Sequence, residues 1–204
     1  MTTVGKSIGS ESELQRRAEA SGDMHLPARP IVLIGLMGAG KSSVGRKLAA
    51  EIGRPFVDAD AEIEAAAGCS INEIFERLGE PAFREGERRV IARLLDGPLA
   101  VIASGGGAFI EPETRALIIA KSISVWLRAD LEVLVKRTAG RTHRPILNAG
   151  EPREVLRKLL ERRYPVYAEA DMTVDTFDQP TDSTVEQVLS ALQSYAAAPA
   201  PLPT

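Results

Sequence analysis

The sequence predicts an α/β fold in which helices flank a mainly parallel sheet. Strand-like segments alternate with helical patterns along the chain, which is the order that produces parallel strands. The first segment, residues 30–35 (PIVLIG), is apolar throughout, as expected of a strand buried on both faces. The length of 204 residues fits one domain, and the 44% of hydrophobic residues is enough for its core.

Four more segments are expected to be strands. The second is short and leads into the acidic stretch FVDAD, and the third, PLAVIASGGG, runs into three glycines. The fourth and fifth, ISVWLR and DMTVDT, are rich in apolar and β-branched residues. The expected strands therefore lie at 30–35, 54–58, within 98–107, at 123–128 and at 171–176.

Helical patterns fill the intervals between these strands. Ser70 and Glu73 have the spacing of a capping box, so a helix should begin there. In the next helical pattern, residues 80–95, the apolar side chains of Phe83, Val90 and Ile91 fall on one side. Asp130 is expected to cap a later helix, DLEVLVKRT. The expected helices are 41–52, 59–67, one from Ser70, 80–95, 130–138, 154–168 and 183–195.

The domain is expected to cover residues 29–195. Residues 1–28 have few large apolar side chains and are predicted to be a flexible extension, with one candidate helix at 11–20. Residues 196–204 form a Pro/Ala tail that cannot build a core. The segment AGRTHRPILNAGEP has turn residues and no apolar periodicity, so we expect a mobile lid at about 138–152.

Composition excludes several kinds of protein. The net charge of −3 argues against nucleic acid as the main partner. The single cysteine, Cys69, excludes a disulfide within the chain and a cysteine-based zinc site, and it is expected to be a packing residue. No apolar run reaches the ~20 residues of a membrane span. The first residues lack the apolar core of a secretory signal, so a cytoplasmic protein is predicted.

A phosphate-binding loop is the strongest motif in the chain. GLMGAGKS, residues 35–42, matches the P-loop pattern, with a buried strand expected before it and a helix after it. Its glycines allow a tight turn that points backbone N–H groups inward, and the helix N-terminus adds partial positive charge. Lys41 can reach the β- and γ-phosphates of a nucleoside triphosphate, and the Ser42 hydroxyl can bind Mg²⁺.

Two carboxylates in FVDAD, Asp58 and Asp60, are the expected acids of this site. The third strand ends in Ser104 and glycines, where many P-loop proteins carry a metal-supporting aspartate. Parallel strands bring their carboxyl ends to one edge of the sheet, so the second strand can supply a carboxylate there. The N-K-x-D and D-x-x-G motifs of regulatory GTPases are absent from the sequence.

A second substrate is suggested by glycines and arginines near the same edge. The triplet GGG at 105–107 could allow close approach of a ligand or could be only a tight turn. Arg84 and Arg163 lie on expected helices, where a lone arginine is usually solvated. Arg141 and Arg144 occupy the expected lid, which would place positive charge over a transferring phosphate and exclude water.

The sequence resembles the shikimate kinase family over about residues 30–195. The resemblance rests on GLMGAGKSS, FVDADAEIE, GEPAFREGE, SGGGAF, RTHRPIL and RRYPVY, in this order and spacing. It implies a P-loop kinase fold of three layers, with a five-stranded parallel sheet, flanking helices and a mobile lid. It also implies transfer of the γ-phosphate of ATP to the 3-hydroxyl of shikimate, a step towards chorismate and the aromatic amino acids, by a monomer.

The resemblance implies roles for residues on the nucleotide side. Lys41 and Arg144 would stabilise charge in the transition state, and Arg137 would stack on adenine, near residues 176–180. Mg²⁺ would be the cofactor, bound by Ser42 directly and by Asp58 through water. The residues implied in binding ATP are Gly38, Ala39, Gly40, Lys41, Ser42, Ser43, Arg137 and Arg144.

It implies a separate set of residues for the acceptor. Asp60 would contact the shikimate hydroxyls and could accept a proton, and Arg84 and Arg163 would bind the carboxylate. Two arginines suit a carboxylate because they can form charge-assisted, often bidentate hydrogen bonds. The remaining residues implied in substrate binding are Gly105, Gly106 and Gly107.

Two other functions are consistent with parts of the pattern. A different small-molecule P-loop kinase, such as a gluconate kinase, would share the P-loop and the fold but not the combination of RRYPVY and GGGAF. A catalytically silent ATP-binding module would need neither Asp60 nor Arg144, which are both present. His143 in the lid is read as a solvated residue.

Overall fold

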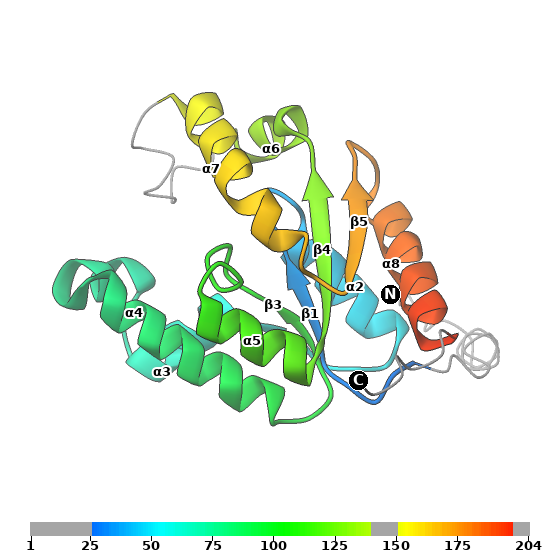
Figure 1. Cartoon of the computed structure of the whole chain (residues 1–204), viewed down its shortest axis with the longest axis horizontal. Coiled ribbons are helices and arrows are strands. Elements are labelled where there is room, and N and C mark those ends of the chain that lie inside the picture. Colours follow the sequence, from blue (N-terminus) through cyan, green and yellow to red (C-terminus); the bar gives the residue numbers. More distant parts are fainter. Residues whose placement is uncertain (1–25, 140–150, 198–204) are drawn as a thin grey trace, which may run out of the picture.

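Five parallel strands form the centre of the molecule, in the order β2-β3-β1-β4-β5 (Figure 1). They are β1 (Ile31–Ile34), β2 (Phe56–Asp58), β3 (Val101–Ala103), β4 (Ile123–Ala129) and β5 (Met172–Thr176). The five strands predicted from the sequence, and their parallel arrangement, are confirmed. The computed structural model describes residues 26–139 and 151–197. The candidate helix at 11–20, most of the predicted lid and the end of the tail lie outside these residues.

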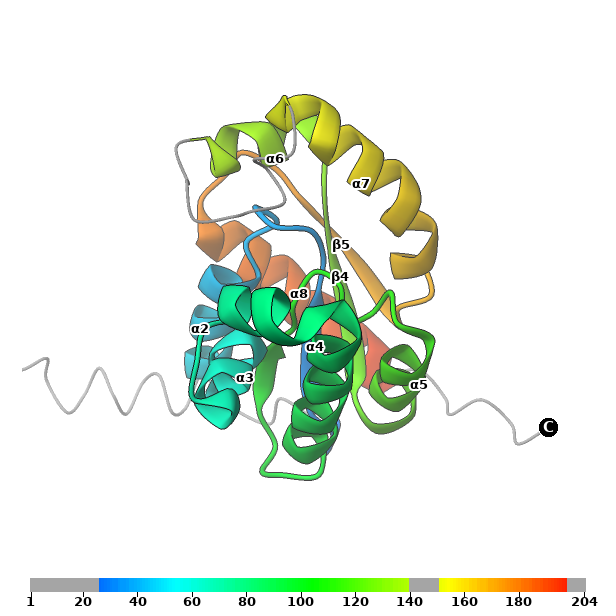
Figure 2. The same cartoon turned by 90° about the vertical axis from the view of Figure 1, so that its left-hand side faces the viewer.

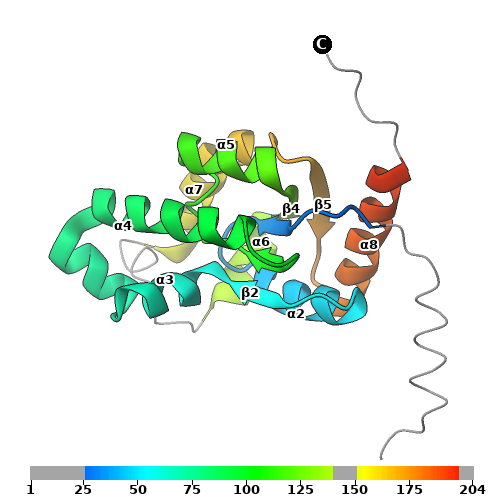
Figure 3. The ribbon, with the colours of Figure 1, turned by 90° about the horizontal axis from the view of Figure 1, so that it is seen from below.

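Helices cover both faces of the sheet, which makes three layers. On one face α2 (Lys41–Glu51) packs against α8 (Thr181–Ala197), and on the other α4 (Ile71–Leu95) packs against α5 (Pro112–Lys121) (Figure 3). All four residues of β1 are buried, as expected for a central strand with helices on each side. No helix in the part of the chain that the structure describes is long and apolar enough to cross a membrane.

The helix α5 was not predicted from the sequence. It follows the glycines after β3, begins with Pro112 at its first position and has Glu113 in its first turn and Lys121 in its last. Proline at the start and lysine at the end are typical signals of helix boundaries. The sequence therefore contained a signal for α5 that the pattern of apolar residues did not reveal.

The long helix α4 is two helices joined at a bend, as the two separate patterns predicted. Gly79 has φ 79° and ψ 172°, a non-helical conformation that favours glycine. The predicted capping box is present, since the Ser70 hydroxyl accepts from the Glu73 amide and Glu73 accepts from the Ser70 amide. Asp130 does occupy the N-cap of α6 (Leu131–Thr138), but its side chain makes no capping hydrogen bond there.

The carboxyl ends of the strands lie between two helical groups. Helices α6 and α7 (Pro152–Tyr167) stand above the ends of the strands, and α3 (Ala59–Ala67) with the first part of α4 projects to one side (Figures 1 and 2). A small apolar cluster of Ile63, Ile74, Phe83 and Val90 joins α3 to α4 apart from the main core. These two groups therefore frame the edge at which the site was expected.

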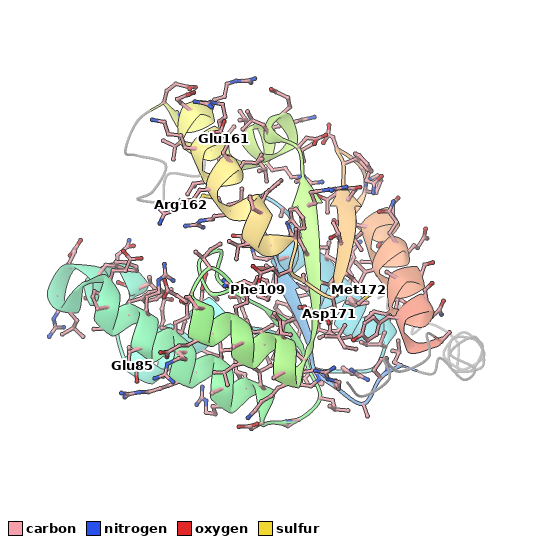
Figure 4. All side chains as sticks on the ribbon, in the orientation of Figure 1. Glu85, Phe109, Glu161, Arg162, Asp171 and Met172 are labelled. Atoms are coloured by element: carbon pink, nitrogen blue, oxygen red, sulfur yellow. The ribbon has the colours of Figure 1, made fainter. Side chains whose placement is uncertain are left out.

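The main core surrounds the sheet and supports the loops at its edge. Phe109, just after the glycine triplet, is fully buried and lies at the centre of the molecule (Figure 4). Asp171, at the entrance to β5, accepts hydrogen bonds from the amide and the hydroxyl of Ser124 on β4, at 2.8 and 2.6 Å. This contact joins the amino ends of β4 and β5, at the edge of the sheet opposite the glycine triplet.

Candidate active site

The P-loop has the backbone geometry that its glycines predict. Gly38 and Gly40 have φ 85° and 102°, in the left-handed region that favours glycine, and α2 begins at the next residue, Lys41. At Gly35 (φ 144°) a Cβ atom would lie 2.7 Å from the Leu127 carbonyl oxygen. The loop therefore connects a buried strand to a helix N-terminus in the arrangement that binds phosphate.

Lys41 lies across this loop. Its Nζ donates hydrogen bonds to the carbonyl oxygens of Gly35 (2.8 Å) and Leu36 (3.1 Å), both in the first part of the loop. These contacts fold the side chain back over the turn, and Lys41 lines the same cleft as the other P-loop residues. An ammonium group held in this way can stabilise charge on a phosphate.

Asp58 links the P-loop helix to the acceptor side of the site. Its Oδ2 accepts a hydrogen bond from the Ser42 hydroxyl at 3.0 Å, and its Oδ1 accepts from the Asp60 amide at 3.2 Å. Asp58 is both the last residue of β2 and the N-cap of α3. The predicted pair of a hydroxyl and a carboxylate is therefore assembled, and both are oxygen donors of the kind that Mg²⁺ prefers.

Few protein ligands are available for a metal at this position. Within residues 26–139 and 151–197, no group of three or more His, Cys, Asp or Glu side chains could hold a metal ion. Mg²⁺ usually keeps several waters and is bound by one or two protein groups together with substrate phosphates. The pair of Ser42 and Asp58 fits this kind of site.

The glycine triplet brings four charged side chains to one turn. A Cβ atom on Gly105 would lie 2.7 Å from Asp60 Oδ1 and 3.0 Å from Glu87 Oε1. On Gly106 it would lie 3.3 Å from Arg163 Nη1, and on Gly107 it would lie 2.6 Å from Arg84 Nη1. Each glycine thus leaves room for a different charged group. The triplet forms a turn against which these side chains pack closely, and close approach of a ligand to it stays a prediction.

Arg84 is held by carboxylates on its own helix. Its Nη1 donates to Glu87 Oε2 at 2.6 Å, and its Nε and Nη2 donate to Glu80 Oε1 at 3.3 and 3.1 Å. Glu80 is well exposed, whereas the side chain of Glu87 is only 1% exposed. Glu87 therefore fixes the guanidinium from inside the protein.

Glu87 is a site residue that the sequence analysis missed. Its burial raises the pKa of its carboxyl group, Arg84 opposes this shift, and the nearby charges of Asp60 and Glu111 add to it. A buried carboxylate with a perturbed pKa beside a basic partner is characteristic of functional sites. The only signal in the sequence was the spacing of Arg84 and Glu87, three residues apart on a helix, which is common on solvated surfaces.

Arg163 and Arg137 reach the site from different helices. Arg163, on α7, donates from Nη1 to the Gly106 carbonyl oxygen at 2.9 Å. Arg137, on α6, donates to the carbonyl oxygens of Gly38 and Ala39, both at 3.4 Å, and to that of Phe177 at 2.5 Å. Arg137 thus lies between the P-loop and the segment 176–180, where adenine was expected.

One cleft of about 960 Å³ contains both halves of the predicted site. The predicted residues in the described part of the chain all line it: Gly38, Ala39, Gly40, Lys41, Ser42, Ser43, Asp58, Asp60, Arg84, Gly105, Gly106, Gly107, Arg137 and Arg163. Within 176–180, Asp178 and Gln179 line the same cleft. Arg141, His143 and Arg144 lie outside the described residues.

Comparison with known proteins agrees with this geometry. The sequence matches the shikimate kinase family model over residues 37–193. The chain belongs to the shikimate kinase family. A shikimate kinase of Paramagnetospirillum magneticum is 62% identical over 167 residues, which cover 82% of this chain and 86% of that protein. A shikimate kinase of Caulobacter vibrioides is 60% identical over 168 residues, covering 82% and 84%.

A solved structure supports membership of the shikimate kinase family. The shikimate kinase from Acinetobacter baumannii, in complex with shikimate, superimposes with a TM-score of 0.79 and 37% sequence identity. The match covers 83% of this chain and 96% of that one. The predicted fold and the predicted family are both confirmed.

Proposed function

We propose that this chain transfers the γ-phosphate of ATP to the 3-hydroxyl of shikimate, giving shikimate 3-phosphate and ADP. The observation that carries the proposal is the single cleft that joins a complete P-loop to a turn surrounded by Asp60, Arg84 and Arg163. A phosphate donor and a hydroxy acid could therefore lie side by side in it. Membership of the shikimate kinase family supports the same acceptor.

The nucleotide half of the cleft would bind and orient the phosphates. Backbone amides of the P-loop and the N-terminus of α2 provide partial positive charge, and Lys41 adds a full one. Ser42 would hold Mg²⁺ directly and Asp58 would hold it through water, and Arg137 would stack on adenine. When bound, Mg²⁺ would neutralise charge on the β- and γ-phosphates.

The acceptor half would bind the hydroxy acid by its charged end. Arg84 and Arg163 carry the positive charges nearest the glycine turn and would pair with the carboxylate. Asp60, across from Gly105, would accept a hydrogen bond from the reacting hydroxyl and could take its proton. Arg144 of the predicted lid would add charge over the transferring group.

A phosphate-transfer assay tests this proposal against the two alternatives. The purified full chain is incubated with Mg²⁺ and γ-labelled ATP, and with shikimate, gluconate or a nucleoside monophosphate as the acceptor. We expect labelled product with shikimate only. Transfer to gluconate or a nucleotide, with none to shikimate, would identify a different kinase. Binding of ATP without shikimate-dependent release of ADP would identify a silent binding module.

Three further properties follow from family membership and stay predictions. We expect the activity to require Mg²⁺, which chelation by EDTA would abolish and added Mg²⁺ restore. We expect the chain to be a monomer by light scattering and to act in the cytoplasm.

A further inference from the structure

The carbonyl group of Gly106 is held by two donors from one helix. Arg163 Nη1 donates to its oxygen at 2.9 Å, and the Tyr167 hydroxyl, one turn further along α7, donates to the same oxygen. A carbonyl oxygen has two lone pairs, so both acceptor positions are used. In the part of the chain that the structure describes, both side-chain donors to the Gly106 carbonyl thus come from α7.

The other two carbonyl groups of the triplet are used within the turn. The Gly105 oxygen accepts from the Ala108 amide at 3.2 Å, and the Gly107 oxygen accepts from the Ile110 amide at 3.0 Å. These local bonds determine the shape of the turn. The bonds to Gly106 instead determine where the turn lies relative to α7 and Arg163.

Tyr167 is well suited to a fixed position. Its side chain is 0% exposed, which makes it one of the largest fully buried side chains. The ring packs against Trp126 and Tyr164, with ring centroids 6.0 and 6.2 Å apart. A buried tyrosine hydroxyl needs a hydrogen-bond partner, and here the partner is a backbone group that lines the cleft. Burial raises the pKa of Tyr167, so the hydroxyl keeps its proton and stays a donor at neutral pH.

We propose that Tyr167 is a positioning residue for the acceptor: its hydroxyl holds the Gly106 carbonyl, and with it the neighbouring Arg163, in the arrangement that receives the carboxylate of the hydroxy acid. This inference rests on the proposed function. Without the hydroxyl, Arg163 is the single side-chain donor left on the Gly106 oxygen in the described structure. The turn and the guanidinium can then shift together, which weakens binding of the acceptor and leaves the P-loop unchanged.

The substitution Tyr167→Phe tests the inference with little disturbance of packing. The ring keeps its volume, and the Gly106 carbonyl keeps its bond from Arg163, so no buried acceptor is left unpaired. Loss of one neutral hydrogen bond should raise the KM for shikimate by up to about tenfold. The KM for ATP and the value of kcat should stay within about twofold of wild type, because no group on the nucleotide side moves.

Tyr164→Phe is the matched control. The Tyr164 hydroxyl also donates to a backbone carbonyl, that of Ala129 on β4, from the same helix and the same aromatic group. A general loss of stability would affect both variants, and thermal unfolding measures that loss in each. We expect Tyr164→Phe to leave the KM for shikimate at the wild-type value.

A double-mutant cycle with Arg163→Ala shows whether Tyr167 acts through Arg163. If Tyr167 acts through Arg163, the substitution Tyr167→Phe should raise the KM for shikimate less in the Arg163→Ala background than in the wild-type background. The inference would be overturned if Tyr167→Phe left the KM for shikimate unchanged, or if it raised the KM for shikimate and the KM for ATP equally. It would also be overturned if the effects of Tyr167→Phe and Arg163→Ala on the KM for shikimate were fully independent. Wild-type protein that does not phosphorylate shikimate would overturn the proposed function itself, and this inference with it.

Discussion

Gly107→Ala gives a direct test of the acceptor half of the cleft. The new Cβ atom would lie 2.6 Å from both Nη1 and Nη2 of Arg84 and 2.8 Å from its Cζ. The backbone of Gly107 does not have a positive φ, so alanine causes no strain of its own there. Non-bonded atoms prefer separations of about 3.5 Å or more, so the guanidinium must move by roughly 1 Å.

This movement has a predictable cost in catalysis. Arg84 Nη1 lies 2.6 Å from Glu87 Oε2, and a displacement of roughly 1 Å would break that hydrogen bond. A misplacement of this size can reduce a rate by about 10²-fold. We therefore expect kcat/KM for shikimate to fall by about 10²-fold, while binding of ATP stays at the wild-type level because the three atoms nearest the new Cβ all belong to Arg84.

The assay is steady-state kinetics with shikimate and ATP varied in turn. Gly86→Ala is the matched control, since a Cβ atom there meets nothing within 4 Å. Gly86 lies in α4 close to Arg84, and alanine in a helix should raise stability by up to about 1 kcal/mol. If Gly107→Ala keeps the wild-type kcat/KM for shikimate, Arg84 does not need its observed position, and its role in binding the carboxylate is refuted.

Further substitutions probe the nucleotide side and the buried carboxylate. Lys41→Ala should lower kcat by roughly 10³-fold or more with both substrates saturating. In Mg²⁺ titrations of activity, Asp58→Asn should raise the Mg²⁺ requirement more than Asp60→Asn does, whereas Asp60→Asn should lower kcat more. Because burial raises the pKa of Glu87, the folded protein binds this proton more tightly than the unfolded chain does. Glu87 thus favours folding below the ordinary glutamate pKa of about 4.3, and this contribution declines as pH rises towards the raised pKa. The Tm of wild type minus the Tm of Glu87→Gln should therefore fall as the pH rises from about 4.3 towards the raised pKa of Glu87.

Each of these expectations has a clear contrary result. Near wild-type turnover of Lys41→Ala would remove Lys41 from the chemistry. Equal Mg²⁺ requirements for the two asparagine variants would contradict the division of roles between Asp58 and Asp60. A difference in Tm that does not change with pH would show that Glu87 has the same pKa in the folded and unfolded states.

The sequence predicted the strands and the P-loop because both depend on local patterns. The apolar run of β1, the spacing of Gly35, Gly40 and Lys41, and the capping box at Ser70 each act within a few residues. The helix α5 was missed because its signals, Pro112 and Lys121, lie at its ends rather than in a clear apolar stripe. Its apolar residues alone did not distinguish it from a turn.

The site residues that were missed depend on contacts between distant segments. Glu87 becomes important only because α4 buries it against Gly105 and beside Arg84. Tyr167 reaches Gly106 across 61 residues of sequence. Both are ordinary helical residues in the sequence. Tyr167 has its partner on another element, and Glu87, whose partner Arg84 is on its own helix, lies against Gly105 from another element. Motif recognition found the groups proposed to contact the substrates, whereas the groups that hold those side chains in place required the folded structure.

The position of Asp58 has a consequence for changing the acceptor of this protein. The Asp58 side chain accepts a hydrogen bond from Ser42 and also caps the start of α3, so the helices that lead along the chain to Arg84 start from a residue on the nucleotide side. Repositioning these helices as a unit would disturb the phosphate site as well. A library that seeks a new hydroxy acid should therefore keep residues 58–60 and Arg84 constant and vary Asn72 and Phe75, which line the same cleft from α4.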